Sequence, residues 1–546
     1  MVANASLLRT NLHKIIIKYT KINTMKKAIK IMAIAMVLIL SVMALVACDL
    51  NLDFPFDGNN TGNGGSGNGT NNGSGNGGSG TGNNNGTGSG KKGTYTLDVY
   101  GINDLHGKFE DSDGQPGIDE MTTYLRYAQE DQNTIFLSAG DMWQGSCESG
   151  LTKGNIITDW MNDLGFSAMT LGNHEFDWGI GPIQANAEIA EFPILAINVY
   201  DLATGKRLEG VDASTVIDKG DVQIGIIGAV GDCYSSISSD KVKGVEFKTD
   251  STLTSLVKAE AIRLREEEGA DFIIYSLHDG GESSSSSVKE YHGNLYNDAG
   301  DYYDLSLSDG YIDLVFEAHT HQNYIVKDDH GVYHLQGGGD NKKGITHANV
   351  VINLENGQAE VKPEFIAHST YASEIDDPIV DTLMEKYDNL VGTMNDSLGT
   401  NKKNRNSADL ADRVAQLYFT KGKEKWGGSY NIILGGGDIN VRSPYNLNTG
   451  DITYSMLYML FPFDNEIVLC SLTGAKLSSR FLSSRYGYVT YGYENQTINT
   501  QGTYYIVTDT WNSSYAANGL KVIDYYAQNY YARDMLADFA KAGGFN

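Results

Sequence analysis

Five short polar motifs in this sequence combine residue types that bind metal ions. They are Asp104-Leu105-His106, Gly140-Asp141, Gly172-Asn173-His174-Glu175, His278 and His319-Thr320-His321. Carboxylate and imidazole groups together suit Zn, Mn, Co or Fe, and one carboxylate can bridge two ions. Two such ions can hold the attacking and leaving oxygens of a phosphoryl displacement. Each motif alone is weak, because a polar residue in a loop is usually part of a solvated turn. Their succession in one chain predicts a site for two divalent metal ions.

Each motif follows a segment that has the composition of a buried strand. We expect these strands at 95–100, 135–137, 168–171, 272–275 and 314–316, with another at 222–230. Helical spacing separates them at 118–129 and 156–164. Strands that alternate with helices indicate a layered α/β domain. Because the carboxyl ends of strands meet at one edge of such a sheet, the polar motifs are expected to converge there.

The motifs also carry a family resemblance. NDLHG, GDMWQGS, GNHEFDWG, SLHDGG and EAHTHQ resemble the ordered blocks of calcineurin-like metallophosphoesterases, and more narrowly those of the secreted 5′-nucleotidase family with its UDP-sugar hydrolases. GGGDINVRSP, GDITYSMLYMLFPFDNEIV and YYIVTDTW are similar to that family's nucleotide-binding domain. The resemblance implies an N-terminal four-layer α/β/β/α metallophosphoesterase domain at 94–372. A linker helix at 373–392 and a C-terminal α/β substrate-binding domain at 393–546 complete the expected architecture.

The resemblance assigns roles to the residues of the motifs. It implies a first ion held by Asp104, His106, Asp141 and His321. It implies a second ion held by Asp141, Asn173, His278 and His319, so that Asp141 bridges the two. The catalytic pair of the family falls on His174 and Asp177: His174 would stabilise charge on the transferring phosphoryl group, and Asp177 would orient its ring. Without the resemblance, the alternative role for Asp177 is the N-cap of a following helix.

The C-terminal segment contains residues that could recognise a nucleotide. The resemblance implies substrate contacts from Arg405, Arg442, Phe463, Asn465 and Trp511. Two rings that sandwich a base contribute about 1–3 kcal/mol per base, although core packing is the alternative for an isolated Phe or Trp. Where relatives have a Gly-Gly-Asp-Gly segment whose Asp contacts base or ribose, this chain has 512–518 (NSSYAAN). Tyr515 could therefore replace Trp511 as the second ring, and the preferred base stays open.

The charge of the chain limits its partners. The formal charge is −27, and the first 47 residues carry seven Lys or Arg and no Asp or Glu. Such an acidic chain should repel nucleic-acid polymers and anionic lipid headgroups. A small anionic substrate such as a nucleotide, which the resemblance implies, must then be held by local positive groups, either metal ions or a few arginines. No sequence feature indicates a protein partner.

The N-terminal region indicates an anchored protein. The apolar run Ile29–Val46 ends at Ala47-Cys48, which resembles a bacterial lipoprotein signal with Cys48 as the lipidated residue. Residues 1–48 are thus expected to be an extension plus signal peptide, although a transmembrane anchor is the alternative. Residues 49–93, rich in Gly, Asn and Ser, should form a flexible tether. This predicts attachment to the outer face of the cell membrane in a bacterial envelope.

These features lead to one expected function and several alternatives. We expect an extracellular, lipid-anchored, two-metal phosphohydrolase that releases phosphate from nucleotides, with UDP-sugar or other nucleotide diphosphate hydrolysis as an extension. A 2′,3′-cyclic-nucleotide 2′-phosphodiesterase/3′-nucleotidase is the alternative enzyme, although those relatives tend to carry Asn where this chain has Asp177. A surface nucleotide-binding lipoprotein, an adhesin or a transporter's binding protein would not need a complete set of metal ligands.

Overall fold

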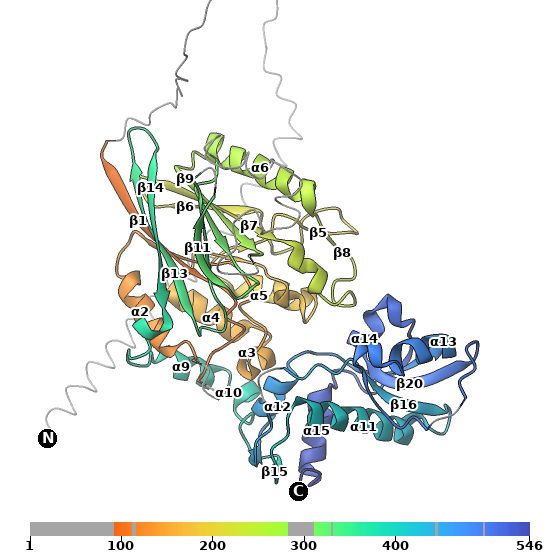
Figure 1. Cartoon of the computed structure of the whole chain (residues 1–546). Coiled ribbons are helices and arrows are strands. Elements are labelled where there is room, and N and C mark those ends of the chain that lie inside the picture. Colours follow the sequence, from red (N-terminus) through yellow and green to blue (C-terminus); the bar gives the residue numbers. More distant parts are fainter. Residues whose placement is uncertain (1–91, 112–115, 282–310, 329–330, 443–445, 495–496) are drawn as a thin grey trace, which may run out of the picture. The chain divides into compact units, whose positions relative to one another are not determined.

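The computed structural model describes residues 92–111, 116–281, 311–328, 331–442, 446–494 and 497–546 (Figure 1). The predicted signal peptide, Cys48 and nearly all of the tether at 49–93 lie outside these ranges. Within the described ranges, no helix combines the length and the apolar composition needed to cross a membrane.

A first sheet contains the strands that carry the first three motifs. Its order is β14-β13-β1-β2-β3-β4. The strands β1 to β4 are parallel to one another, and β13 and β14 extend the sheet in antiparallel fashion. Their bounds are β1 Thr94–Ile102, β2 Thr134–Ser138, β3 Ala168–Thr170, β4 Ile194–Leu195, β13 Gly344–Asn353 and β14 Ala359–Ala367. Tyr95, Leu97 and Val99 alternate with polar residues in the strand expected at 95–100. Leu97 and Val99 are fully buried in β1, as this alternation predicts.

A second sheet carries the last two motifs. Its order is β11-β12-β10-β9-β7-β6, in which β12, β10, β9 and β7 are parallel and the edge strands are antiparallel. The bounds are β6 Ser214–Asp218, β7 Gln223–Val230, β9 Phe272–His278, β10 Leu314–Glu317, β11 Asn323–Lys327 and β12 Tyr333–Gly337. Every residue of β9 is buried, which explains why this strand is a nearly continuous apolar run.

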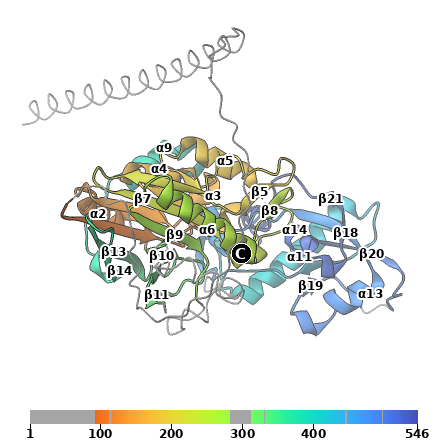
Figure 2. The ribbon, with the colours of Figure 1, turned by 90° about the horizontal axis from the view of Figure 1, so that it is seen from above.

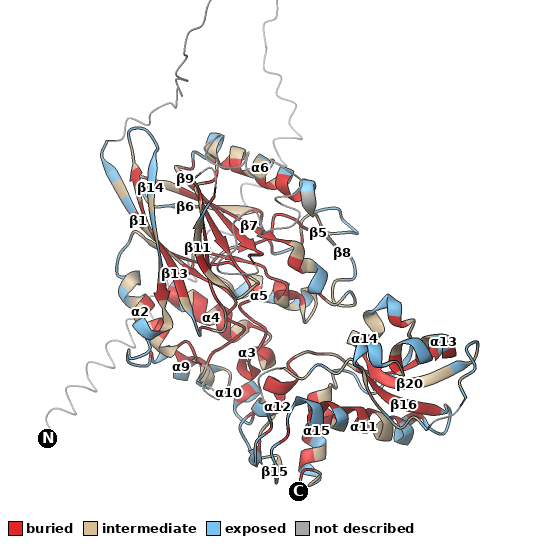
Figure 3. Cartoon of the chain, viewed as in Figure 1, coloured by how far each residue is buried: buried red, intermediate tan, exposed pale blue. Residues whose placement is uncertain are grey.

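Three hydrophobic clusters hold four layers together (Figure 3). Between the sheets, Leu97 and Ile135 of the first belong to one cluster with Ile224 and Phe272 of the second. Helices α2 (Asp119–Gln129) and α4 (Asn155–Leu164) contribute to the cluster on the outer side of the first sheet. Helix α6 (Asp250–Glu266) lies over β7 and β9 on the outer side of the second sheet (Figure 2). The expected α/β/β/α arrangement is therefore confirmed.

Two short helices stand where one linker helix was expected. Helix α9 (Ile379–Lys386) ends before Tyr387, and α10 (Asp388–Val391) follows it. The Tyr387 hydroxyl donates a hydrogen bond to Asp159 of α4 at 2.6 Å. Val380 and Leu383 of α9 are buried in the cluster beside the first sheet, so this segment packs as part of the core.

A third sheet forms the C-terminal part of the chain. Its order is β19-β16-β20-β18-β21, and β16 and β20 are parallel. The bounds are β16 Ile432–Gly437, β18 Ile467–Thr473, β19 Val489–Tyr491, β20 Thr503–Asp509 and β21 Lys521–Tyr525. The helices of this part include α11 Ser407–Trp426, α12 Tyr454–Leu460, α14 Thr510–Ser514 and α15 Ala532–Lys541. Leu410, Val414 and Tyr418 of α11 are buried in a cluster with Val507 of β20, which gives this part a core of its own.

Candidate metal centre

The five polar motifs come together at the carboxyl ends of five strands. Asp104 and His106 follow β1, Asp141 follows β2, and the Asn173 motif follows β3. His278 is the last residue of β9, and the His319 motif follows β10. The expected convergence is therefore present, but it joins the edges of two sheets and not the edge of one.

One group of ligand atoms corresponds to the first predicted ion. The donor atoms of Asp104, His106 and His321 all lie within 4.8 Å of one another. The Nε2 atoms of His106 and His321 face each other at 2.9 Å, and His321 Nε2 is 3.5 Å from Asp104 Oδ1. Burial and the neighbouring His321 lower the pKa of His106 to about 3. A neutral imidazole is the form that ligates a metal ion, so this group fits a divalent cation.

A second group surrounds His278. Its Nε2 atom lies 3.1 Å from Asp141 Oδ2 and 3.2 Å from Asn173 Oδ1, and its ring is 5.5 Å from that of His319. Asp141 forms candidate ligand groups both with His106 and with His278. It therefore occupies the position that a bridging carboxylate requires, and the structure brings all seven predicted ligands together.

Backbone carbonyl groups orient the two most buried imidazoles among the predicted ligands. His106 Nδ1 donates to the carbonyl oxygen of Gln144 at 3.1 Å, and His278 Nδ1 donates to that of Ala139 at 2.7 Å. When Nδ1 carries the proton, the lone pair of Nε2 remains for a metal ion. Such partners fix both the tautomer and the ring orientation of a ligating histidine.

Backbone strain is concentrated at the same place. Nine described residues other than glycine have a positive φ, and five of them are predicted ligands: Asp104, His106, Asp141, His319 and His321. A left-handed conformation in such residues costs of order 1–3 kcal/mol and persists only where the surroundings enforce it. This distribution marks the loops as a functional site.

Two glycines allow these loops to approach each other. Gly140 has φ of +102°, and a Cβ atom there would lie 2.6 Å from His278 Nδ1. A Cβ atom on Gly172 would lie 2.2 Å from Asp141 Oδ1. The glycines of the second and third motifs are thus required by close packing around the ligands.

His174 and Asp177 form a hydrogen-bonded pair beside the ligands. His174 Nδ1 is 2.7 Å from Asp177 Oδ2, and its backbone N–H donates to Asp141 Oδ1 at 2.8 Å. Burial opposes the charge on His174, but the carboxylates of Asp177 and Asp141 outweigh it and raise the pKa of His174 to about 9. The N-cap alternative for Asp177 is wrong, because helix α5 (Ile180–Ile189) has Gly179 as its N-cap.

Glu175 is a positioning residue. It belongs to the third polar motif, but no function was predicted for it from the sequence. Its fully buried carboxylate accepts hydrogen bonds from four backbone N–H groups, those of Asp141, Met142, Trp143 and Gly172, at 2.7–3.1 Å. One side chain therefore ties the loop after β2 to the loop after β3. Burial, with the charge of Asp141 adding to it, raises the pKa of Glu175 to about 7 against these donors.

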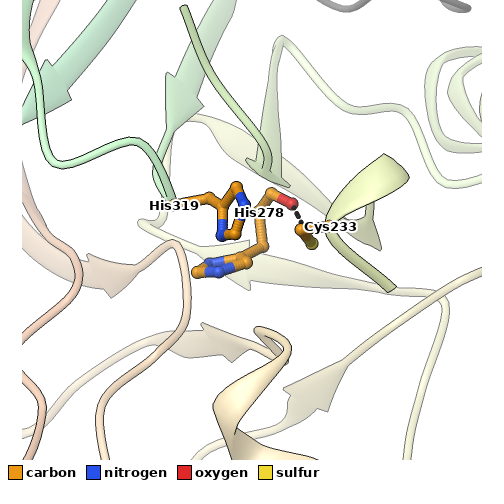
Figure 4. A group of neighbouring side chains, drawn as sticks. All are labelled: Cys233, His278 and His319. Carbon is orange, nitrogen blue, oxygen red and sulfur yellow. Dashed lines mark hydrogen bonds between the residues drawn. The ribbon is translucent and has the colours of Figure 1, made fainter. Parts of the chain in front are cut away.

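Cys233 is a second residue that the sequence did not single out (Figure 4). It lies in the 3₁₀ helix η2 (Asp232–Ser236), and its Sγ atom is within 4.8 Å of ligand atoms of His278 and His319. The thiol donates to the carbonyl oxygen of His278 at 3.0 Å, and burial raises its pKa well above the ordinary value. Cys233 thus packs as a neutral thiol against a predicted ligand. Its spacing in the sequence offered no signal of this proximity.

A cavity of about 240 Å³ adjoins the catalytic pair. His174, Asp177 and Lys241 line one side of it, and three predicted substrate residues line the other: Phe463, Asn465 and Trp511. The Phe463 ring stacks on that of His174 with centroids 6.0 Å apart. Lys241 Nζ donates to the carbonyl oxygen of Asp464 at 3.0 Å, which links the two sides.

The remaining predicted substrate residues lie elsewhere. The guanidinium of Arg442 is 3.6 Å from Asp340, whose N–H donates to the carbonyl oxygen of Asp104, so Arg442 stands near the first ligand group. Arg405 is 8% exposed, donates to Asn401 and lies 5.0 Å from the Phe545 ring. The structure thus does not bring Arg405 to the cavity, because its guanidinium is held inside the C-terminal part.

The second ring of the cavity is Trp511. Tyr515 packs edge-on against Trp511 at 4.9 Å but is 45% exposed and is absent from the described cavity lining. This placement favours Trp511 over Tyr515 as the partner of Phe463.

Comparisons with known proteins agree with this geometry. Residues 97–323 match the calcineurin-like phosphoesterase family. An apyrase of Tabanus yao is 33% identical over 241 residues, which cover 42% of this chain and 39% of that protein. A 5′-nucleotidase of Vibrio cholerae is 32% identical over 194 residues, 34% of each protein. The protein UshA of Yersinia enterocolitica is 27% identical over 434 residues, 70% of this chain and 75% of that protein.

Solved structures show the same fold. A 5′-nucleotidase precursor from Thermus thermophilus superposes with a TM-score of 0.58 at 17% identity, over 82% of this chain and 96% of that one. The alignments with the apyrase and the Vibrio protein span less than half of those relatives.

Proposed function

Because residues 97–323 form a calcineurin-like phosphoesterase domain, we propose that this chain is a two-metal phosphohydrolase that releases phosphate from nucleotides. One observation carries the proposal. The seven predicted metal ligands and the His174–Asp177 pair meet beside a cavity that Phe463 and Trp511 also line. A phosphate end and an aromatic end in one cavity match a nucleotide.

The ligand set fits two divalent ions of the Zn, Mn, Co or Fe type. Bound there, such ions would neutralise phosphoryl charge and lower the pKa of a water molecule to about 7. The chain itself contributes three functions. Asp141 serves both ligand groups, Glu175 holds their loops, and His174 carries a proton toward the phosphoryl group. Asp177 fixes the imidazole ring, so that the proton on Nδ1 stays in its hydrogen bond.

The substrate class rests on the second wall of the cavity. Aromatic rings stack on any base and so tolerate several nucleotides. The names of the relatives, a 5′-nucleotidase, UshA and an apyrase, support a nucleotide substrate. We extend the proposal to UDP-sugars and other nucleotide diphosphates as further substrates of the same site.

The location of the enzyme is part of the proposal. The apolar run that ends at Cys48 supports a lipid anchor on the outer face of a bacterial cell membrane, with residues 49–93 as a tether. Mass spectrometry of the N-terminal peptide tests this. A lipid-modified Cys48 at the mature N-terminus is expected, and a peptide that reads unmodified through Ala47 into Cys48 would favour a transmembrane anchor.

A substrate panel tests the activity. Phosphate release is measured from nucleoside monophosphates, UDP-sugars, 2′,3′-cyclic nucleotides and p-nitrophenyl phosphate, with Mn, Zn and Co supplied separately. The proposal predicts the highest kcat/KM for nucleoside monophosphates. Preference for cyclic nucleotides would show a phosphodiesterase, and turnover of p-nitrophenyl phosphate alone would show a phosphatase for other esters.

A further inference from the structure

A second, smaller cavity, the inner cavity, adjoins the substrate cavity at the two rings. The two cavities share four lining residues: Phe463, Trp511, Asn440 and Asn465. The smaller one has about 30 Å³ of space, enough for a water molecule or a small polar group of a ligand. Asp438 is among the residues that line only this inner part. The inner part thus combines aromatic walls with a carboxylate.

Among the residues that the structure describes, none partners the carboxylate of Asp438. Asp438 makes no hydrogen bond and no ion pair through this group with any other residue in the described ranges. The neighbouring Asp509, which also lines the inner cavity, is already committed. It accepts hydrogen bonds from Tyr418 at 3.2 Å and from Asn512 at 2.8 and 3.0 Å. Asp438 is therefore the carboxylate that remains to accept a hydrogen bond from a ligand.

The side chain of Asn512 binds both backbone polar groups of Asp438 and so fixes its position. The Asn512 side chain accepts from the Asp438 N–H at 2.8 Å and donates to the Asp438 carbonyl oxygen at 3.1 Å. Asn512 is fully buried, and Asn518 donates to its carbonyl oxygen at 2.9 Å. Gly437, with φ of +150°, permits this approach, because a Cβ atom there would lie 2.5 Å from Asn512 Oδ1.

The two asparagines that make these hydrogen bonds belong to residues 512–518, which stand where relatives have Gly-Gly-Asp-Gly. Residues 512–518 supply two asparagines but no acid of their own. The asparagines instead fix a carboxylate from the loop after β16. The same wall therefore presents a negative charge, which disfavours phosphate there and leaves the phosphate to the His174 end of the cavity.

We propose that Asp438 accepts a hydrogen bond from a neutral O–H or N–H donor of the nucleoside, and that Asn512 is the positioning residue that aims it. The donor is either a ribose hydroxyl or an exocyclic amino group of the base. This inference rests on the proposed nucleotide substrate and names the residue that distinguishes nucleosides from other groups.

The test compares Asp438→Asn with the wild type on AMP and on p-nitrophenyl phosphate. Asparagine keeps an acceptor oxygen but loses the charge, so the weaker hydrogen bond should lower kcat/KM for AMP about 10-fold, mainly through KM. The value for p-nitrophenyl phosphate should fall far less, because that substrate has no nucleoside donor. Asp451→Asn, an exposed residue of β17 (Gly450–Ile452), is the matched control and should behave as wild type.

Two further substrates identify the donor. If a ribose hydroxyl is bound, the wild type should discriminate against 2′,3′-dideoxy-AMP, and Asp438→Asn should lose that discrimination. If the exocyclic amino group is bound, the wild type should discriminate against IMP, which lacks this group, and Asp438→Asn should lose that discrimination. Asn512→Ala should reproduce the rise in KM for AMP, and the double variant should lose no more than Asp438→Asn alone.

The outcomes separate this inference from the proposed function. Wild-type turnover of AMP together with an unchanged KM in Asp438→Asn overturns the role of Asp438 and leaves the nucleotidase intact. Wild-type turnover of p-nitrophenyl phosphate without AMP hydrolysis overturns both. If Asn512→Ala does not fold, the comparison of Asp438→Asn with Asp451→Asn still tests whether Asp438 binds the nucleoside.

Discussion

Glu175→Gln is the substitution that tests how the ligand loops are held. In the wild type, Oε1 accepts from the N–H groups of Met142 and Trp143, and Oε2 accepts from those of Asp141 and Gly172. The amide oxygen of glutamine can satisfy one pair, but its NH₂ group would face the other pair. Two buried N–H groups would lose their acceptor, at about 1–3 kcal/mol each. The metal-free variant should therefore unfold about 2–6 kcal/mol more easily.

The same change should weaken metal binding. Loss of a group that orients ligands typically costs 10- to 100-fold in metal affinity. Denaturant unfolding of the metal-free protein measures the first effect, and calorimetric titration with Mn²⁺ measures the second. Glu188→Gln, an exposed residue of α5, makes the same chemical change without these donors and serves as the control. If Glu175→Gln matches this control in both assays, the proposed role of Glu175 is refuted.

Five further substitutions, in three experiments, test the assigned roles. Asp141→Asn should lose far more bound metal than Asn173→Ala, because Asp141 is the ligand predicted to bridge the two ions and forms ligand groups with both His106 and His278; equal metal content by elemental analysis would contradict the bridging role. His174→Asn should lower kcat about 10²- to 10⁴-fold with both ions retained, whereas loss of metal would show that His174 is a ligand. Phe463→Ala and Trp511→Ala should each lower kcat/KM for AMP about 5- to 150-fold while p-nitrophenyl phosphate is hydrolysed nearly as before. If both variants keep the wild-type kcat/KM for AMP, the C-terminal part binds no base.

Much of the catalytic part could be predicted from the sequence because its strands are short apolar runs, each followed by a polar loop. The strand at 95–100 and the helix at 156–164 both appear in the structure within a few residues. The strands β11 to β14 were not anticipated, since their mixed composition gives a weak pattern. The division of the motifs between two sheets also depends on long-range pairing, which residue spacing does not encode.

The positioning residues were harder to predict than the ligands. Metal ligands are recognisable because Asp and His cluster in loops after strands. Glu175 and Asn512 act through backbone groups of distant loops, and Cys233 reaches His278 only in the folded chain. Arg405 shows the opposite case: the resemblance implied a substrate contact, but the fold places it against Asn401 and Phe545.

The central claim is that two ions act together in one site. The most direct test removes all metal from the protein with a chelator and then titrates Mn²⁺ while bound ions per chain and phosphate release from AMP are measured in parallel. The account predicts that the rate rises only as occupancy passes from one ion to two, because Asp141 links both ligand groups. Full activity at one bound ion per chain, or in the metal-free protein, would contradict it.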